Sequence, residues 1–171
     1  MKYNVLILLV FVCSTGFSQL INHNVQVSTG YNRIGFFNEA SYKLGIKNNY
    51  LKLGARHYTF DTFFEKNTIG ASIDYTYHVN SKNDKFYFYP GISFSVFSEI
   101  KTNIKLIVKD YKLINGIGYN GIKNLSIYYQ LGFGVIDATS TVNKVDEIVK
   151  INYFNYEMVF GLCYRFGTAT K

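Results

Sequence analysis

Hydrophobic and polar residues alternate with a period of two along most of the chain. Eight segments carry this alternation, at residues 23–33, 37–47, 50–60, 68–79, 85–97, 111–119, 125–136 and 151–166. Because successive side chains of a β-strand point to opposite faces, a period of two predicts strands with one apolar and one polar face. Segment 111–119 shows the pattern least clearly. The sequence therefore predicts an all-β protein with eight strands.

The bulky apolar face and the small polar face differ in charge. In the four clearest segments, 68–79, 85–97, 125–136 and 151–166, the bulky face carries no charged residue. A soluble barrel or sandwich would bury its bulky face and expose a charged one. The distribution instead predicts bulky side chains that face lipid, around a narrow interior filled by small and polar residues.

Segment lengths and connections indicate the type of barrel. A tilted membrane strand needs roughly 9 to 11 residues, which most of these segments provide. Only helices and closed barrels satisfy every backbone polar group in lipid, and nothing after the N-terminal run resembles a transmembrane helix. Short connections at 48–49, 81–84 and 120–124 contrast with long polar ones at 98–110 and 137–150. Short periplasmic turns and longer outer loops are typical of outer-membrane proteins, so we expect an eight-stranded antiparallel up-and-down transmembrane β-barrel.

The short connections are also consistent with the assignment of the apolar and polar faces. Residues paired across a hairpin point to the same side of the sheet. The three short connections are expected to pair apolar residues: Ile46 with Leu51, Val79 with Phe86, and Tyr119 with Leu125.

The first 18 residues have the composition of a secretory signal peptide. Lys2 supplies a positive charge, residues 5–13 form an apolar run, and Gly16-Phe17-Ser18 gives a small-x-small ending. The run is shorter than the roughly 20 residues of a membrane-spanning helix. We expect cleavage between Ser18 and Gln19, export from the cytoplasm, and a barrel domain at 19–171.

Composition and charge narrow the function classes. The chain of 171 residues holds 16 Tyr and 15 Phe but a single Pro, which suits many strands. Its net charge is +7, or +6 without Lys2, and an exported basic chain is expected to meet anionic lipid headgroups, not nucleic acid. Cys163 is the only cysteine after cleavage, which excludes a disulfide framework and a metal-binding cysteine cluster.

Six charged residues fall on the face that is expected to line the interior: Lys43, Lys52, Arg56, Asp74, Glu157 and Arg165. Charges in a narrow lumen must be paired or wetted. Arg56 and Asp74 lie on adjacent predicted strands, so we expect them to make contact. One interpretation is a gated pore or a proton path. The other, which the narrow bore of eight strands favours, is a polar plug that fixes the barrel.

Aromatic residues gather toward the ends of the segments, including Tyr77, Phe86, Tyr119, Tyr164 and Phe166. Rings at such positions are typical of the girdles that barrels place at both membrane interfaces. A Ser-His hydrolase needs a histidine between a nucleophile and a carboxylate. His57 is expected on the lipid face without such neighbours, and His78 shares the inward face with Thr76 and Asp74, but no compact His-x-Ser motif is present. With no metal spacing or phosphate loop either, we expect no catalytic residue, metal or cofactor.

The ending of the signal before Gln19, the eight alternating segments and the closing Leu162-x-Tyr164-x-Phe166 resemble the small outer-membrane β-barrel proteins of Bacteroidota, an OmpA/OmpX-like class. The likeness covers the whole mature chain. It implies an outer-membrane location, insertion by the barrel-assembly machinery, contact with outer-membrane lipid and lipopolysaccharide, and no common activity. Such proteins end on an aromatic residue, whereas this chain continues from Gly167 to Lys171.

The expected function is that of a non-enzymatic, porin-like outer-membrane barrel with a structural role or a role in surface recognition. Two alternatives remain open. One is a hydrolase that modifies lipid A or phospholipid at the barrel wall, since small barrels include such enzymes. The other is a soluble lipocalin-like carrier.

Overall fold

The computed structural model describes residues 21–61, 68–80, 85–101, 104–122, 124–142 and 147–166. The signal peptide expected at 1–18 and the tail after residue 166 lie outside this part of the chain. In chain order the strands are β1 (Ile21–Asn32), β2 (Gly35–Ile46), β3 (Asn49–Asp61), β4 (Thr68–Tyr77), β5 (Val79–Asn80), β6 (Phe86–Lys101), β7 (Ile104–Ile122), β8 (Leu125–Val142) and β9 (Glu147–Phe166). Within these ranges, no helix has the length and apolarity to span a membrane.

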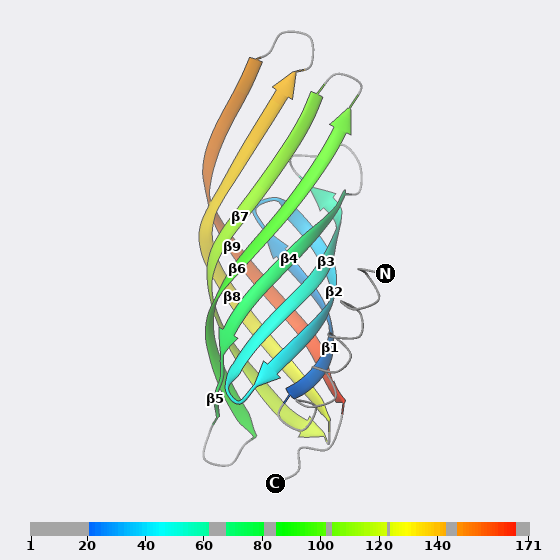
Figure 1. The fold of residues 1–171 in the computed structure, drawn as a ribbon, viewed down its shortest axis with the longest axis vertical. Coiled ribbons are helices and arrows are strands. Elements are labelled where there is room, and N and C mark those ends of the chain that lie inside the picture. Colours follow the sequence, from blue (N-terminus) through cyan, green and yellow to red (C-terminus); the bar gives the residue numbers. More distant parts are fainter. Residues whose placement is uncertain are drawn as a thin grey trace, which may run out of the picture.

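The strands form a closed barrel (Figure 1). Neighbours in the chain pair antiparallel, and β1 pairs with β9 to close the ring. The two-residue β5 continues β4, because both pair with β6. The predicted eight-stranded antiparallel barrel is therefore confirmed.

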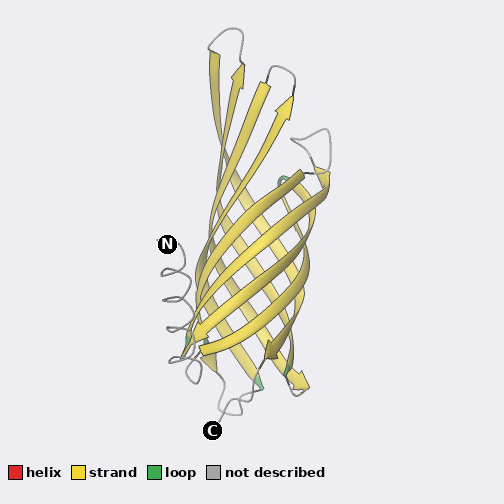
Figure 2. Cartoon of the chain, turned by 45° about the vertical axis from the view of Figure 1, so that its right-hand side comes forward, coloured by secondary structure: helices red, strands yellow, loops and turns green. Residues whose placement is uncertain are grey.

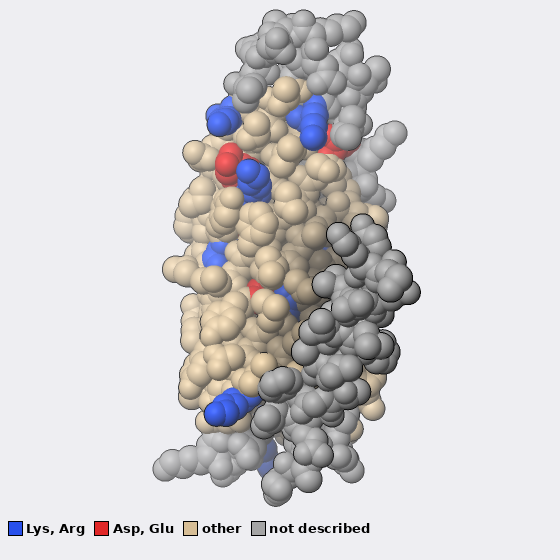
Figure 3. Space-filling model, viewed as in Figure 1, with Lys and Arg blue, Asp and Glu red and all other residues tan. Residues whose placement is uncertain are grey.

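The alternation of faces is also confirmed. Along β4 every second residue is buried and every other one is exposed. Bulky side chains point outward, as shown by Ile73, Phe133 and Phe160, which are 40%, 53% and 53% exposed. On the face seen in Figure 3, uncharged side chains cover most of the wall, and the larger groups of charged atoms lie toward its two ends. The core of the molecule is thus the lumen, and it is largely polar.

The barrel has a tall wall and a short wall. Strands β6 to β9, the tall wall, hold 16 to 20 residues each, whereas β1 to β4, the short wall, hold 10 to 13. The tall wall continues as two hairpins beyond the rim of the short wall (Figure 2). The segments 98–110 and 137–150 were expected as polar loops, although the sequence also allowed 101–109 to continue the two flanking strands; the described residues of both segments are strand. Above the rim these strands have no barrel interior to line, so their sequence loses the alternation that marks the wall below.

At the opposite end, which we call the short-turn end, the predicted parity holds but the predicted pairs were wrong by two residues. The structure pairs Leu44 with Leu51, Val79 with Phe88, and Tyr119 with Ile127. The turn between β2 and β3 occupies residues 47–48 instead of the predicted 48–49, so the pairing of these two strands differs by two residues from the prediction. A slip of two residues leaves every side chain on its face, so the hydrophobic pattern does not detect it.

Candidate functional site

Side chains fill the described interior in four successive layers. From the short-turn end these are a polar vestibule, an aromatic layer, a network of ion pairs and an apolar layer. Strand β2 shows this order with its inward residues Lys43, Glu39 and Phe37. The candidate functional site is this interior, and each layer has its own chemistry.

The ion-pair network lies at the middle of the lumen. Lys52 Nζ is 2.5 Å from Glu39 Oε1 and 2.6 Å from Asp74 Oδ2. Arg56 also bonds Glu39, and its Nη1 lies 2.6 Å from Glu157 Oε2. The side chains of these pairs are at most 7% exposed, so each ion depends on its partners instead of water.

The network extends to β7 and β9. Lys112 Nζ lies 2.7 Å from Glu157 Oε2 and also pairs with Asp110. Asn155 Nδ2 donates to Asp110 Oδ1 over 2.9 Å. Strands β2, β3, β4, β7 and β9 are thereby joined across the bore, as expected of a plug that fixes the barrel.

The structure places the predicted interior charges in two groups. Lys52, Arg56, Asp74 and Glu157 lie in the network, whereas Arg165 lines the vestibule. The expected contact of Arg56 with Asp74 is replaced by that of Lys52, which lies directly opposite Asp74 in the register of β3 and β4. Arg56 lies opposite Gly70 and reaches across the lumen instead.

Sequence reasoning missed three members of the network: Glu39, Asp110 and Lys112. Glu39 lies two and four residues before Ser41 and Lys43, so the alternation of the sequence already placed its side chain on the inward face. Asp110 and Lys112 fall where a loop and the least clear segment were expected. Their inward position follows from β7 being a continuous strand from Ile104 to Ile122.

The aromatic layer is built around His78. Its ring centroid lies 4.0 Å from that of Tyr50, 4.8 Å from that of Tyr87 and 5.2 Å from that of Tyr89. Lys43 Nζ lies 2.9 Å from His78 Nε2, and because an ammonium only donates, that nitrogen accepts. The rings leave no free bore at this level within the described residues.

Two glycines of β7 make room for this layer. A Cβ on Gly118 would lie 2.0 Å from the Tyr87 ring, and one on Gly116 would lie 2.1 Å from the Tyr89 ring. Tyr87 and Tyr89 therefore require glycine at the facing positions of β7, because a side chain there would clash with their rings. Between this layer and the ion pairs there is a cavity of about 10 Å³, room for about one water molecule.

The apolar layer lies beyond the ion pairs, toward the tall-wall end. Phe37, Tyr58 and Phe97 are 0 to 1% exposed, with the Tyr58 ring 5.4 Å from Phe37 and 4.8 Å from Phe97. The Arg56 guanidinium lies 4.6 Å from the centre of the Phe37 ring. This layer covers the ion pairs and keeps water from them.

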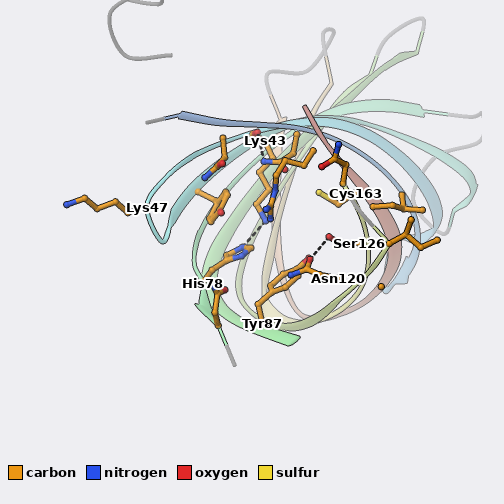
Figure 4. A pocket seen from close by; sticks show the side chains of 16 residues that line it. Lys43, Lys47, His78, Tyr87, Asn120, Ser126 and Cys163 are labelled. Carbon is orange, nitrogen blue, oxygen red and sulfur yellow. Dashed lines mark hydrogen bonds between the residues drawn. The ribbon is translucent and has the colours of Figure 1, made fainter. Parts of the chain in front are cut away.

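The vestibule is a cavity of about 490 Å³ at the short-turn end (Figure 4). Among the described residues, its lining includes Lys43, Lys47 and Arg165 but no aspartate or glutamate. Lys43 reaches toward His78 at the floor, whereas Lys47 extends away from the cavity. Ser126 Oγ donates to Asn120 Oδ1 over 2.6 Å on the wall. The vestibule is thus hollow, polar and positively charged.

The five aromatic residues expected in a girdle lie on the outer face at the short-turn end. They are 40 to 51% exposed: Tyr77, Phe86, Tyr119, Tyr164 and Phe166. The centroids of Phe86 and Tyr119 lie 4.9 Å apart, and those of Tyr164 and Phe166 lie 5.1 Å apart. This arrangement is what a membrane-interface girdle requires.

The histidines have no nucleophile and carboxylate arranged around them in the described structure. His57 lies on the outer face, opposite Asn38 and Ile69 on the neighbouring strands. His78 is enclosed by rings and Lys43. Among the described residues, no group of three or more His, Cys, Asp or Glu side chains could hold a metal ion.

Comparison with known proteins finds similar structures but no similar sequences. No family model and no curated protein matches the chain. The N-terminal β-barrel domain of Pseudomonas aeruginosa OprF superposes with a TM-score of 0.54 at 12% identity, covering 85% of this chain and 97% of that one. A major outer membrane protein of Thermus thermophilus gives a TM-score of 0.48 at 13% identity, covering 85% and 99%. Neisserial surface protein A gives 0.46 at 13% identity, covering 85% and 96%. The likeness to OprF supports the eight-stranded barrel fold.

Proposed function

We propose that this chain is a non-enzymatic outer-membrane β-barrel protein whose tall wall takes part in recognition at the cell surface. The outward face of the barrel carries the proposal, because most of the 34 large hydrophobic side chains that are exposed among the described residues lie on it. Soluble monomers rarely expose apolar patches larger than about 300 to 600 Å². Facing acyl chains, the same side chains need no further partner.

The filled interior supports a structural or recognition role over transport. The aromatic layer and the ion pairs leave a cavity of about 10 Å³ between them, which passes no solute. A lipocalin-like carrier would need an apolar cavity inside the barrel. Here the middle of the lumen is occupied by Arg56, Glu157 and their partners instead.

The two ends of the barrel support one orientation. Short turns are typical of the periplasmic side and longer extensions of the outer side, so the tall wall would project from the cell. Beyond the short wall it exposes Lys105, Lys109 and Lys150. The edges of β6 and β9 have no described neighbouring strand there, since β1 pairs with β9 only as far as Asn32 and Glu157. An exposed sheet of this kind, with lysines on its surface, is suited to contact with molecules outside the cell.

The enzyme alternative finds no support in the described side chains. A hydrolase at the barrel wall needs a nucleophile, a base and an orienting carboxylate within hydrogen-bond distance. His57 has Asn38 and Ile69 as its cross-strand neighbours, which supply neither a nucleophile nor a carboxylate.

Cysteine labelling of intact cells tests both the location and the orientation. In a Cys163→Ser background, Lys105→Cys should react with a membrane-impermeant maleimide on whole cells, and Lys47→Cys only after lysis. The protein should fractionate with outer membranes and migrate differently on gels before and after boiling. Recovery from the soluble periplasm, or labelling of Lys47→Cys in intact cells, would contradict the proposal.

A further inference from the structure

The vestibule differs in charge balance from the rest of the lumen. In the ion-pair network, Lys52, Arg56 and Lys112 each have two carboxylate partners. The described lining of the vestibule holds cations and no carboxylate. The positive charge of the vestibule therefore comes from its own side chains, because the cations deeper in the lumen are balanced by carboxylates.

Two cations of the vestibule make no ion pair with a described residue. Lys43 is 6% exposed, and its ammonium is held by His78 Nε2 at 2.9 Å and by the rings of Tyr50 at 4.7 Å and Tyr89 at 5.3 Å. These neutral partners orient the charge without cancelling it. Asp74, on the next layer, is engaged by Lys52 at 2.6 Å.

Arg165 is the second of these cations. It points inward from β9, close to the end of that strand, and is half-buried in the cavity wall. The described residues offer its guanidinium no carboxylate within ion-pair distance. A guanidinium has a planar fork of donors that matches both carboxylate and phosphate oxygens. A buried cation without a counterion is costly, so an anion that enters the cavity is stabilised there.

The remaining lining supplies neutral donors and sufficient room. Five asparagines surround the cavity: Asn22, Asn24, Asn80, Asn120 and Asn124. An asparagine amide has two N–H donors, and that of Asn24 uses one of them on Lys43 O over 3.3 Å. The volume of about 490 Å³ falls in the range of sites for small molecules, about 300 to 1,000 Å³.

We propose that the vestibule is a binding site for a small oxyanion, a carboxylate or a phosphate. Lys43 supplies charge at the floor, Arg165 supplies a bidentate donor at the wall, and the asparagines supply neutral hydrogen bonds. The aromatic layer beneath closes the site, so the ligand binds and leaves on the same side. That this side is the periplasm rests on the proposed function, whereas the site itself does not.

Calorimetric titration of the purified chain in a neutral detergent at low ionic strength tests the site. The probes are inorganic phosphate and citrate, which separate a phosphate ligand from a carboxylate ligand. We expect saturable binding of at least one probe. Arg165→Gln should raise its Kd about tenfold or more, because a charge-assisted hydrogen bond is lost. Lys43→Met should do the same from the floor of the cavity.

Lys105→Gln is the matched control, because it removes one positive charge from the tall wall, far from the vestibule. It should leave the Kd within about twofold. Each variant is first checked for the heat-dependent gel mobility of an assembled barrel, so a folding defect is separated from a binding defect. Absence of saturable binding in the assembled wild type would overturn the site, as would equal weakening by Lys105→Gln and Arg165→Gln. Either result would leave the outer-membrane proposal standing.

Discussion

Replacing Arg56 by methionine tests whether the ion-pair network holds the barrel together. The Arg56 side chain is 0% exposed and bridges Glu39 of β2 and Glu157 of β9. Methionine is similar in length and carries no charge, so the variant removes two ion pairs without opening a large void. The perturbation is therefore mainly electrostatic.

The expected magnitude follows from what the two carboxylates retain. Glu39 keeps Lys52 at 2.5 Å, and Glu157 keeps Lys112 at 2.7 Å. These two lysines also serve Asp74 and Asp110, so four buried carboxylates of the network then share two cations and negative charge is left uncompensated. Removing one partner from a buried pair typically costs about 3 to 5 kcal/mol. We expect the free energy of unfolding to fall by about that amount. Arg56→Lys keeps the charge but cannot bridge both carboxylates with a planar fork, and should cost about 1 to 3 kcal/mol.

Urea titration in lipid vesicles, followed by gel mobility, measures the loss. Gel mobility is suitable because the chain has no Trp to report unfolding by fluorescence. Lys150→Met, at an exposed position of the tall wall, is the control and should change stability by less than about 0.5 kcal/mol. Adding Glu157→Gln to Arg56→Met should cost less than the sum of the single changes, because the two sites are coupled. A loss below about 1 kcal/mol for Arg56→Met would refute the reasoning.

Three further predictions concern packing, the outer face and the bore. A Cβ on Gly134 would lie 1.7 Å from the carbonyl oxygen of Tyr111, so Gly134→Ala should destabilise the barrel by about 1 to 3 kcal/mol. Gly132→Ala should cost less in the same urea titration, because its nearest contacts would be side-chain atoms of Lys112, Ile114 and Glu157 at 3.2 to 3.4 Å. Ile73→Lys on the outer wall should lower the free energy of unfolding in vesicles by about 2 to 4 kcal/mol, whereas Thr139→Lys beyond the rim should lower it by about 0 to 1 kcal/mol. Equal losses for the two variants would contradict a lipid-facing wall. The assembled protein should show no steady conductance in planar bilayers, since the cavity within the filled lumen measures about 10 Å³, and stable open channels would contradict the plug.

The sequence predicted the faces of the strands but not their register. Lys52 and Arg56 share a parity, so the alternation directs both inward and does not distinguish which of them meets Asp74. Their partners depend on register, and a slip of two residues changes every partner while it leaves every face unchanged. The structure pairs Asp74 with Lys52 for this reason.

The vestibule was harder to foresee, because its residues come from the ends of strands. Lys43 and Arg165 were predicted to face the interior, but nothing in the sequence separates a paired cation from an unpaired one. Asn120 and Asn124 both line this cavity. They lie where β7 turns into β8, next to the register shift between Tyr119 and Ile122. Such irregularities are set by local backbone geometry, which periodicity does not describe.

The layered interior determines where this protein can interact with other molecules. The bore is crossed by rings, ion pairs and an apolar layer, so contact with other molecules through the barrel ends falls to the tall wall and the vestibule. The tall wall offers an extended sheet at one end, and the vestibule offers a cationic cavity at the other. Because the network ties β2, β3, β4, β7 and β9 together between them, the two ends are held at a fixed spacing by a rigid middle.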